Sequence, residues 1–255
     1  MYRPDPERFG PGPYPTVVAV YGGPNVQHVT DSWSMTVDMR AQFLCSRGVL
    51  VLKVDNRGSA RRGAAFEGCV RHRLGTVEVA DQVMLVRWAV GQGLADPARV
   101  GIYGWSYGGY LAALCLCKAP GVFKAAVAGA PVTDWEGYDT MYSERYMGLP
   151  ASNREGYAAS SVMHHCANLT RQQRLLIVHG LLDENVHARH TFRLVNHANE
   201  LGLSGSIELL LFPDERHMMK GLEARLKLET ELTRFLEAEL AADPAPADDD
   251  EPMAE

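Results

Sequence analysis

No hydrophobic run in the 255-residue sequence approaches the roughly 20 apolar residues that a membrane-spanning helix needs, and the N-terminal stretch does not read as a signal peptide. Lysine and arginine together number 25 against 31 aspartates and glutamates, and they form no basic cluster. No internal repeat is visible, so blades of a propeller and solenoid arrays are not expected. We therefore expect a globular protein that binds neither a membrane nor nucleic acid.

The five cysteines are an odd number and have no spacing typical of a metal site. They favour reduced, mostly buried thiols and a cytoplasmic location. His187 and His190, three residues apart, are a weak metal pattern because no carboxylate partners accompany them. We therefore expect no metal and no cofactor.

The apolar content of 46% is enough for one large domain with a substantial core. Residues 1–14 are rich in proline and glycine and are interpreted as a linker-like segment. Residues 242–255, "ADPAPADDDEPMAE", are acidic and cannot form a core, so we expect a disordered tail. Residues 15–241 remain as the single domain.

Short runs rich in valine, isoleucine and leucine alternate with longer amphipathic stretches, which is typical of strands buried on both faces of a mostly parallel sheet. The expected strands are residues 16–23, 48–59, 99–106, 124–132, 174–180 and 206–213. The expected helices are residues 76–92, 107–118, 188–202 and 222–240. This alternation predicts a doubly wound α/β sheet with helices on both faces.

The segment "GIYGWSYGGYLA" (101–112) contains the pattern Gly-x-Ser-x-Gly between an expected strand and an expected helix. In α/β-hydrolases this setting places a serine on a strained turn with its hydroxyl exposed above the sheet. Side chains at Gly104 or Gly108 would obstruct the close approach of strand and helix. We therefore predict that Ser106 is a nucleophile.

A serine hydroxyl needs a base, and the base needs an orienting carboxylate. Asp183 follows the strand "LLIVHG", and His217 follows the strand "IELLLF", which gives the chain order Ser, Asp, His of α/β-hydrolases. Glu184 is the adjacent rival to Asp183, whereas His179 lies at a strand end and favours a structural role. Asp214 and Glu215 are interpreted as solvated loop charges.

The oxyanion of an acyl-transfer reaction needs hydrogen-bond donors. One is expected from the backbone N–H of Tyr107, the residue after the nucleophile. The second is expected from the loop after the first strand, "YGGP" (21–24), as either a backbone N–H or the Tyr21 hydroxyl. By spacing alone, Tyr21 is equally consistent with a core aromatic.

Long segments of the sequence resemble the catalytic domain of the dipeptidyl peptidase IV subfamily of prolyl oligopeptidases. They include "YGGP", "DNRGS", "RLGTVEVADQ", "GWSYGGY", "VFKAAVAGAPVTDWEGYDTMYSERYMGLP" and "DENVH". The loops "HGLLDENVH" and "FPDERH" are most similar to those of the cytosolic dipeptidyl peptidases 8 and 9. The resemblance runs from about residue 15 to residue 240.

The resemblance implies an α/β-hydrolase fold and the removal of dipeptides from peptide N-termini with proline or, less well, alanine at the second position. It implies Ser106 as nucleophile, Asp183 as orienter, His217 as general base and acid, and Tyr21 as the oxyanion donor beside Tyr107. It also implies that Asn185 holds the substrate carbonyl. The proline pocket that it implies is lined by Tyr107, Val132, Trp135, Tyr138, Tyr142 and Val186.

Relatives also carry an N-terminal β-propeller whose glutamates bind the substrate's amino group, and no blade-like repeat is seen in this sequence. Gly137 stands where relatives often have a larger residue.

Two alternative functions stay open. One is an esterase or an acylaminoacyl or prolyl oligopeptidase-type hydrolase, and the other is an inactive dimerisation or scaffold module. Relatives dimerise partly through late helices, so a homodimer through residues 222–240 is a further expectation, against simple packing of this helix on its own sheet.

Overall fold

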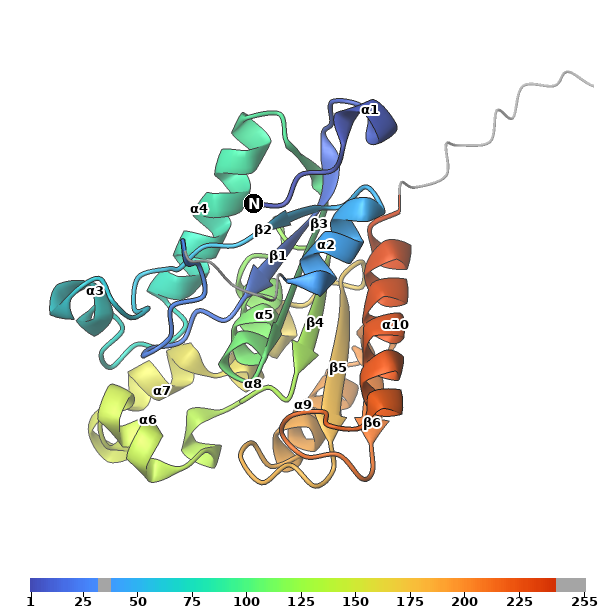
Figure 1. Cartoon of the computed structure of the whole chain (residues 1–255). Helices are drawn as coiled ribbons and strands as arrows, with labels where there is room; N and C mark the ends of the chain where they lie inside the picture. The colour runs from blue at the N-terminus through green and yellow to red at the C-terminus, as the bar shows by residue number, and fades with distance from the viewer. Residues whose placement is uncertain (32–37, 242–255) are drawn as a thin grey trace, which may run out of the picture.

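The computed structural model describes residues 1–31 and 38–241, and within them six strands form one parallel sheet in the order β2-β1-β3-β4-β5-β6 (Figure 1). The strands are β1 (Tyr14–Val20), β2 (Leu50–Leu52), β3 (Ala95–Trp105), β4 (Ala125–Gly129), β5 (Arg174–Gly180) and β6 (Ile207–Phe212). Every pair is parallel, as continuous apolar strands separated by helices predict. The expected α/β sheet is therefore confirmed.

Two expected strands differ from the structure in more than the exact position of their ends. The segment 48–59 contributes only the three residues of β2, because its second half, "DNRGS", turns away from the sheet. The strand at 206–213 is not buried on both faces: β6 is an edge strand, and Glu208 and Leu209 are exposed. An edge strand has a neighbour on one side only, so an apolar run does not by itself place a strand in the middle of a sheet.

Helices cover both faces of the sheet (Figure 1). The helices are α1 (Pro6–Phe9), α2 (Met39–Ser46), α3 (Ala64–Gly68), α4 (Val77–Gly91), α5 (Tyr107–Lys118), α6 (Thr140–Met147), α7 (Arg154–Ser160), α8 (Val162–His165), α9 (Arg189–Glu200) and α10 (Leu222–Glu239). Leu44 of α2 and Phe235 of α10 belong to the core on one face. Leu111 of α5, Val86 of α4 and Leu194 of α9 belong to the core on the other.

The sheet order changes direction at β1, since β2 lies on one side of it and β3 to β6 follow on the other. In open parallel sheets, sites form outside the carboxyl ends of the strands where the order reverses. The segments after β1 and β3 begin at Tyr21 and Ser106. The topology therefore brings these two residues to the same edge of the sheet.

Part of the segment expected to be linker-like packs on the domain. Tyr2 forms a bridge with Val51 of β2, and α1 lies at residues 6–9. Tyr14 is already the first residue of β1 and is buried. The acidic segment 242–255 lies outside the described residues, and the domain division stays a prediction.

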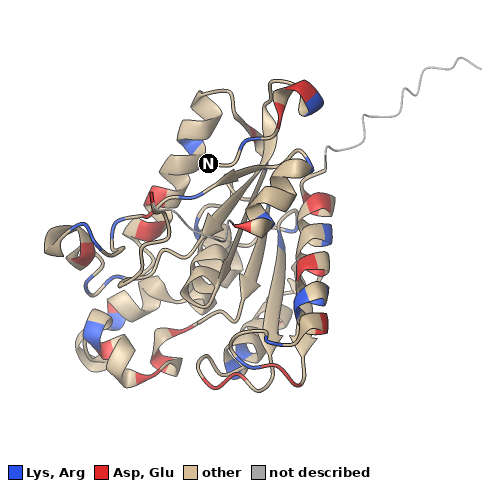
Figure 2. Ribbon diagram, in the orientation of Figure 1, with Lys and Arg blue, Asp and Glu red and all other residues tan. Residues whose placement is uncertain are grey.

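The surface charges are mixed in sign. Along the ribbon of α10 in Figure 2, basic and acidic residues alternate rather than gather by sign. Of the helices that the structure describes, none is both long and apolar enough to cross a membrane. The five cysteines are free thiols, and the cytoplasmic location inferred from them stays a prediction.

Candidate active site

Ser106 occupies a strained turn between β3 and α5. Its backbone φ is +58° and its ψ is −116°, a conformation that costs free energy for a residue with a side chain. The Ser106 N–H donates to the Gly129 carbonyl at 2.8 Å, and the Ser106 carbonyl accepts from Tyr110 in the first turn of α5. The turn is thus held from both sides, and the half-buried serine stands at the N-terminus of a helix.

The glycines of this turn are required by close backbone contacts. A Cβ on Gly104 would lie 2.4 Å from the backbone of Gly108 and 2.5 Å from the Val20 carbonyl oxygen. A Cβ on Gly108 would lie 2.3 Å from that same oxygen. Real Cβ atoms do not approach backbone this closely, so the turn packs against the end of β1 only because these positions lack side chains.

Asp183 and His217 meet because the loops after β5 and β6 are joined by backbone hydrogen bonds. Leu182 N–H donates to the Glu215 carbonyl at 3.0 Å, and a Cβ on Gly180 would lie 2.4 Å from that same oxygen. His217 Nδ1 then lies 2.8 Å from Asp183 Oδ2. A proton on Nδ1 leaves Nε2 as the acceptor that a general base needs.

The loop that carries His217 is also fixed by its own side chains. Trp105 Nε1 donates to the His217 carbonyl at 2.8 Å, which ties the loop to the residue before the nucleophile. Glu215 accepts from the N–H groups of Lys220 and Gly221 at 2.9 and 3.0 Å. Glu215 is a loop charge with exposed hydrogen bonds, as expected, and its carboxylate also holds the turn that follows.

The Asp183 carboxylate has a complete set of hydrogen-bond donors. Oδ1 accepts from the N–H groups of Asn185 and Val186 at 2.9 and 2.8 Å, and Oδ2 accepts from His217 and, at 3.3 Å, from His179. Burial raises the pKa of Asp183, but the hydrogen bonds from His179, His217 and Asn185 outweigh it and hold the pKa well below its usual range. Asp183 is therefore a carboxylate at neutral pH.

His179 is fully buried and binds the same loop. Its Nε2 donates to the Val186 carbonyl at 2.8 Å as well as facing Asp183, and its Nδ1 accepts from the Thr191 hydroxyl at 2.7 Å. The structural role expected for His179 agrees with these contacts. Its contact with Asp183, which sequence spacing does not signal, places it directly behind the aspartate–histidine pair.

Tyr21 and Tyr107 lie side by side next to the Ser106 turn. Their ring centroids are 6.2 Å apart, and a Cβ on Gly23 would lie 2.7 Å from Cγ of Tyr107. Burial raises the pKa of the Tyr21 hydroxyl, so the hydroxyl keeps its proton at neutral pH and can donate it in a hydrogen bond. The Tyr107 N–H is among the free amides of the first turn of α5, where negative charge is favoured.

The side chains expected to line the proline pocket are brought together. Trp135 stacks on Tyr142 with ring centroids 5.7 Å apart, and it contacts Tyr107 at 5.5 Å and Tyr138 at 5.8 Å. The Tyr138 hydroxyl donates to Asn185 Oδ1 at 2.6 Å, which leaves the Asn185 NH₂ group to donate elsewhere. Val132 and Val186 are buried beside this cluster.

His190 holds the loop that carries Trp135. Its Nδ1 accepts from the Thr133 N–H at 3.2 Å, and its Nε2 donates to the Gly137 carbonyl at 3.2 Å. A Cβ on Gly137 would lie 3.0 Å from Cε1 of this ring, which gives a physical reason for glycine at this position. Burial lowers the pKa of His190 to about 4, so the imidazole is neutral at neutral pH.

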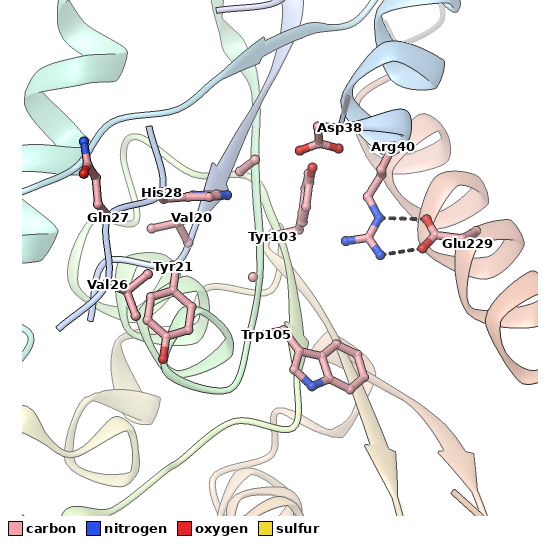
Figure 3. Close-up of a pocket in the computed structure, with 12 residues that line it drawn as sticks. Val20, Tyr21, Val26, Gln27, His28, Asp38, Arg40, Tyr103, Trp105 and Glu229 are labelled. Atoms are coloured by element: carbon pink, nitrogen blue, oxygen red, sulfur yellow. Dashed lines mark hydrogen bonds and ion pairs between the residues drawn. The ribbon is translucent and has the colours of Figure 1, made fainter. Parts of the chain in front are cut away.

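A cavity of about 480 Å³ lies beside the Ser106 turn (Figure 3). Tyr21 and Trp105 line the end of the cavity near the turn, and Tyr103 and His28 line the other end. In Figure 3, Arg40 forms a bidentate ion pair with Glu229 of α10, at 2.5 and 2.7 Å. The cavity thus combines aromatic walls near the turn with paired charges farther away.

Among residues 1–31 and 38–241, no three or more histidine, cysteine, aspartate or glutamate side chains are grouped to hold a metal ion. His187 is exposed and accepts from the Arg189 N–H, whereas His190 is buried in the contacts described above. The two histidines therefore have different surroundings, one at the surface and one in the interior.

Comparison with known proteins agrees with this geometry. The sequence profile of the prolyl oligopeptidase family matches residues 35–243. This chain belongs to the prolyl oligopeptidase family. Dipeptidyl peptidase 8 of Mus musculus is 41% identical over 240 residues, which cover 93% of this chain and 27% of that protein. Dipeptidyl peptidase 4 of Sus scrofa is 36% identical over 226 residues, which cover 88% of this chain and 29% of that protein.

A solved structure of the same family has the same fold. The crystal structure of Porphyromonas gingivalis dipeptidyl peptidase 4 superposes with a TM-score of 0.82 at 37% identity, covering 92% of this chain and 32% of that chain. The expected resemblance and the α/β-hydrolase fold class are thereby confirmed. The chain spans about a quarter to a third of the length of these family members.

Proposed function

We propose that this chain is the catalytic domain of a serine peptidase that releases N-terminal dipeptides with proline or alanine at the second position. The observation that carries the proposal is the 2.8 Å contact between His217 and Asp183, at the edge of the sheet where Ser106 stands on its strained turn. Membership of the prolyl oligopeptidase family also supports a serine peptidase. The names of the relatives, dipeptidyl peptidases 8 and 4, support the dipeptide product.

In the proposed reaction, Ser106 Oγ attacks the carbonyl carbon of the scissile bond while His217 Nε2 accepts its proton. The resulting oxyanion accepts hydrogen bonds from the Tyr21 hydroxyl and the Tyr107 N–H. Collapse of the intermediate breaks the C–N bond, and His217 returns its proton to the leaving amine. A water molecule, deprotonated by His217, then attacks the acyl-enzyme; the ester C–O bond breaks, and His217 returns that proton to Ser106 Oγ as the acid product leaves. Asp183 stays ionised throughout and stabilises the imidazolium.

The aromatic cluster supports recognition of proline. A pyrrolidine ring is rigid and apolar, and the rings of Tyr107, Trp135 and Tyr142 offer it flat apolar surfaces. Val132, Tyr138 and Val186 complete the proposed pocket. The free NH₂ group of Asn185 is the donor proposed for the substrate carbonyl.

The experiment compares purified wild type and Ser106→Ala on three substrates: a Gly-Pro chromogenic amide, its N-blocked form and p-nitrophenyl acetate. A dipeptidyl peptidase hydrolyses the first, and Ser106→Ala abolishes that turnover. Preference for the blocked amide or the ester would indicate the acylaminoacyl peptidase or esterase alternative. A folded wild type whose Ser106 fails to react with a fluorophosphonate would indicate the scaffold alternative.

The proposed oxyanion role has its own test. Removing one donor of this kind costs about 3 kcal/mol of transition-state stabilisation, so Tyr21→Phe lowers kcat by about 10²-fold or more while the fold is kept. Near-normal turnover of a folded Tyr21→Phe variant would remove Tyr21 from the mechanism.

We further propose that two copies associate through α10 and the adjoining edge strand. Leu222 and Leu226 of α10 are 70% and 61% exposed, and Leu209 of β6 is 42% exposed. Leu222 and Leu226 lie one turn apart on α10, and β6 has an unpaired edge; each of these features supports an interface of this kind. Sedimentation velocity tests it: a dimer in wild type that dissociates in Leu226→Glu supports the proposal, and a monomeric wild type contradicts it.

A further inference from the structure

Helix α4 presents two polar side chains to the protein interior. Glu78 and Gln82, one helical turn apart, are both fully buried, on the same face as Val79 and Val86. Burying a carboxyl and an amide costs free energy unless they are hydrogen-bonded. The hydrogen bonds of these two side chains therefore indicate which parts of the site this face of α4 holds.

Glu78 binds Tyr107. The Tyr107 hydroxyl donates to Glu78 Oε1 at 2.8 Å, and the Gly75 N–H donates to the same oxygen at 2.9 Å. Burial raises the pKa of Glu78 and raises that of the Tyr107 hydroxyl. Glu78 thus fixes the side chain of the residue whose N–H is the proposed oxyanion donor.

Gln82 acts on the other proposed donor through one intermediate side chain. Its Nε2 donates to Asn56 Oδ1 at 2.8 Å, and Asn56 Nδ2 donates to the Gly22 carbonyl at 2.9 Å. Asn56 is also buried, and a Cβ on Gly22 would lie 2.7 Å from Asn56 Oδ1. This chain of amides therefore sets the backbone position of the residue directly after Tyr21.

The two segments held by α4 contact each other. Gly23 packs on the Tyr107 ring, and Gly108 packs on the Val20 carbonyl and on Cα of Tyr21. A displacement of either segment would change the spacing between the Tyr21 hydroxyl and the Tyr107 N–H. Catalytic donors need placement within about 0.5 Å, so this spacing has little tolerance.

We propose that Glu78 and Gln82 are positioning residues that hold the two oxyanion donors in register from one buried face of α4. The proposal rests on the proposed function, since it assumes that Tyr21 and Tyr107 are those donors. In this proposal neither side chain contacts the substrate: Glu78 acts through the Tyr107 side chain, and Gln82 acts through Asn56 and the backbone of Gly22.

The kinetic experiment uses Gln82→Leu, Glu78→Leu and Glu78→Gln, with Val86→Ala as the matched control on the same buried face. Rates are expressed per active site, titrated with a fluorophosphonate, so that loss of folded protein is removed from kcat. We expect Gln82→Leu and Glu78→Leu to lower kcat by about 10- to 100-fold, with KM within threefold, because small misplacements of catalytic groups have effects of this size. Glu78→Gln keeps an acceptor for the Tyr107 hydroxyl, so we expect it to retain most of the kcat that Glu78→Leu loses.

Inhibitors separate positioning from a general structural role. A prolyl boronate forms a tetrahedral anion that needs the oxyanion donors, whereas the matching pyrrolidide fills the pocket without one. We expect Gln82→Leu to weaken binding of the boronate by about the same factor by which kcat falls, and to change the affinity for the pyrrolidide by less than threefold. Equal weakening of both inhibitors, or a kcat per site equal to that of Val86→Ala, overturns the proposal.

A measurement independent of activity distinguishes failure of this proposal from failure of the proposed function. With 3-fluorotyrosine incorporated at position 21, the ¹⁹F resonance of wild type is compared with those of Gln82→Leu and Val86→Ala. The proposal predicts a shifted or broadened resonance in Gln82→Leu alone, and an unchanged resonance overturns it even in an active enzyme. A shifted resonance in a protein whose Ser106 reacts with no probe keeps the positioning of Tyr21 and rejects the peptidase.

Discussion

The Nδ1 atom of His217 lies 2.8 Å from Oδ2 of Asp183, across 34 residues of sequence. The contact depends on the backbone bond between Leu182 and Glu215, which joins the loops after two neighbouring parallel strands. The same carboxylate oxygen also faces His179 at 3.3 Å. Asp183 is thus a shared acceptor for two imidazoles of different exposure, one half-buried near the proposed nucleophile and one in the interior.

Asp183→Asn tests the role of the carboxylate. The amide has nearly the same shape, but its NH₂ group cannot accept the Nδ1 proton, so the imidazole turns to the tautomer that cannot act as a base. We expect kcat for a Gly-Pro substrate to fall by about 10³- to 10⁴-fold with little change in KM. Steady-state kinetics on protein with native circular dichroism checks this, and a loss below tenfold would contradict the role.

Two substitutions of His179 test its contact with Asp183. Phenylalanine at this position fills the space but leaves the Val186 carbonyl and Asp183 Oδ2 without the Nε2 donor. Glutamine can place an amide N–H near the former Nε2. We expect His179→Phe to lower kcat by about tenfold or more, because the aspartate loses its orientation, and to lower the free energy of unfolding by about 1–3 kcal/mol. His179→Gln recovers part of both, and equal kinetics for the two variants would contradict the prediction.

His190 gives the fold a pH dependence. The pKa of His190 is about 4 in the folded chain, because of burial, and near 6.5 in an unfolded chain. Between these pH values the unfolded state binds a proton that the folded state does not. The contribution to stability, about 3 kcal/mol, is therefore complete above pH 6.5 and is lost as the pH falls toward 4.

Urea unfolding of wild type and His190→Gln at several pH values between 4.5 and 7.5 measures this contribution. The free energy of unfolding rises more steeply with pH in wild type, since the variant lacks the titrating ring. Two parallel curves would show that another group is responsible. The Gly-Pro KM is expected to rise together with the acid destabilisation, because the loop held by His190 carries Trp135.

Gly108→Ala tests the tightness of the serine turn. Its Cβ would lie 2.3 Å from the Val20 carbonyl oxygen, a backbone atom that cannot move without displacing β1. We expect a loss of at least several kcal/mol of stability or failure to fold, measured by thermal denaturation. Gly121→Ala is the control, because no atom lies within 4 Å of its added Cβ. Equal melting temperatures for the two variants would show that the turn relaxes.

The parts of the site that follow strands were predictable from the sequence. Ser106 directly follows a run that becomes a parallel strand, and Asp183 and His217 come three and five residues after such strands, whose ends share one edge of the sheet. The helix expected at 107–118 has these same bounds in the structure, because the strained serine defines its start. Strand burial was harder to predict, since edge and central strands of this sheet have similar compositions.

The buried polar residues were not predictable from periodicity. Val79, Val83, Val86 and Val90 have the spacing of one apolar helix face. In the structure Val83 and Val90 are only half-buried, whereas Glu78 and Gln82 lie in the interior. Apolar periodicity identifies a helix and its approximate face, and it has no signal for a polar side chain whose partner is distant in sequence. Only the contacts with Tyr107 and Asn56 reveal why these residues are inside.

In the first turn of α9, two neighbouring residues hold different parts of the candidate site. His190 forms hydrogen bonds with the loop that carries Trp135, and Thr191 forms one with His179, which contacts Asp183. Under the proposed function, selectivity for the second residue of the substrate and the rate of the reaction would therefore depend on the same turn of α9. The proposed function then predicts that changes to this turn made for new selectivity also alter turnover, so a variant library of that kind needs compensating changes around His179.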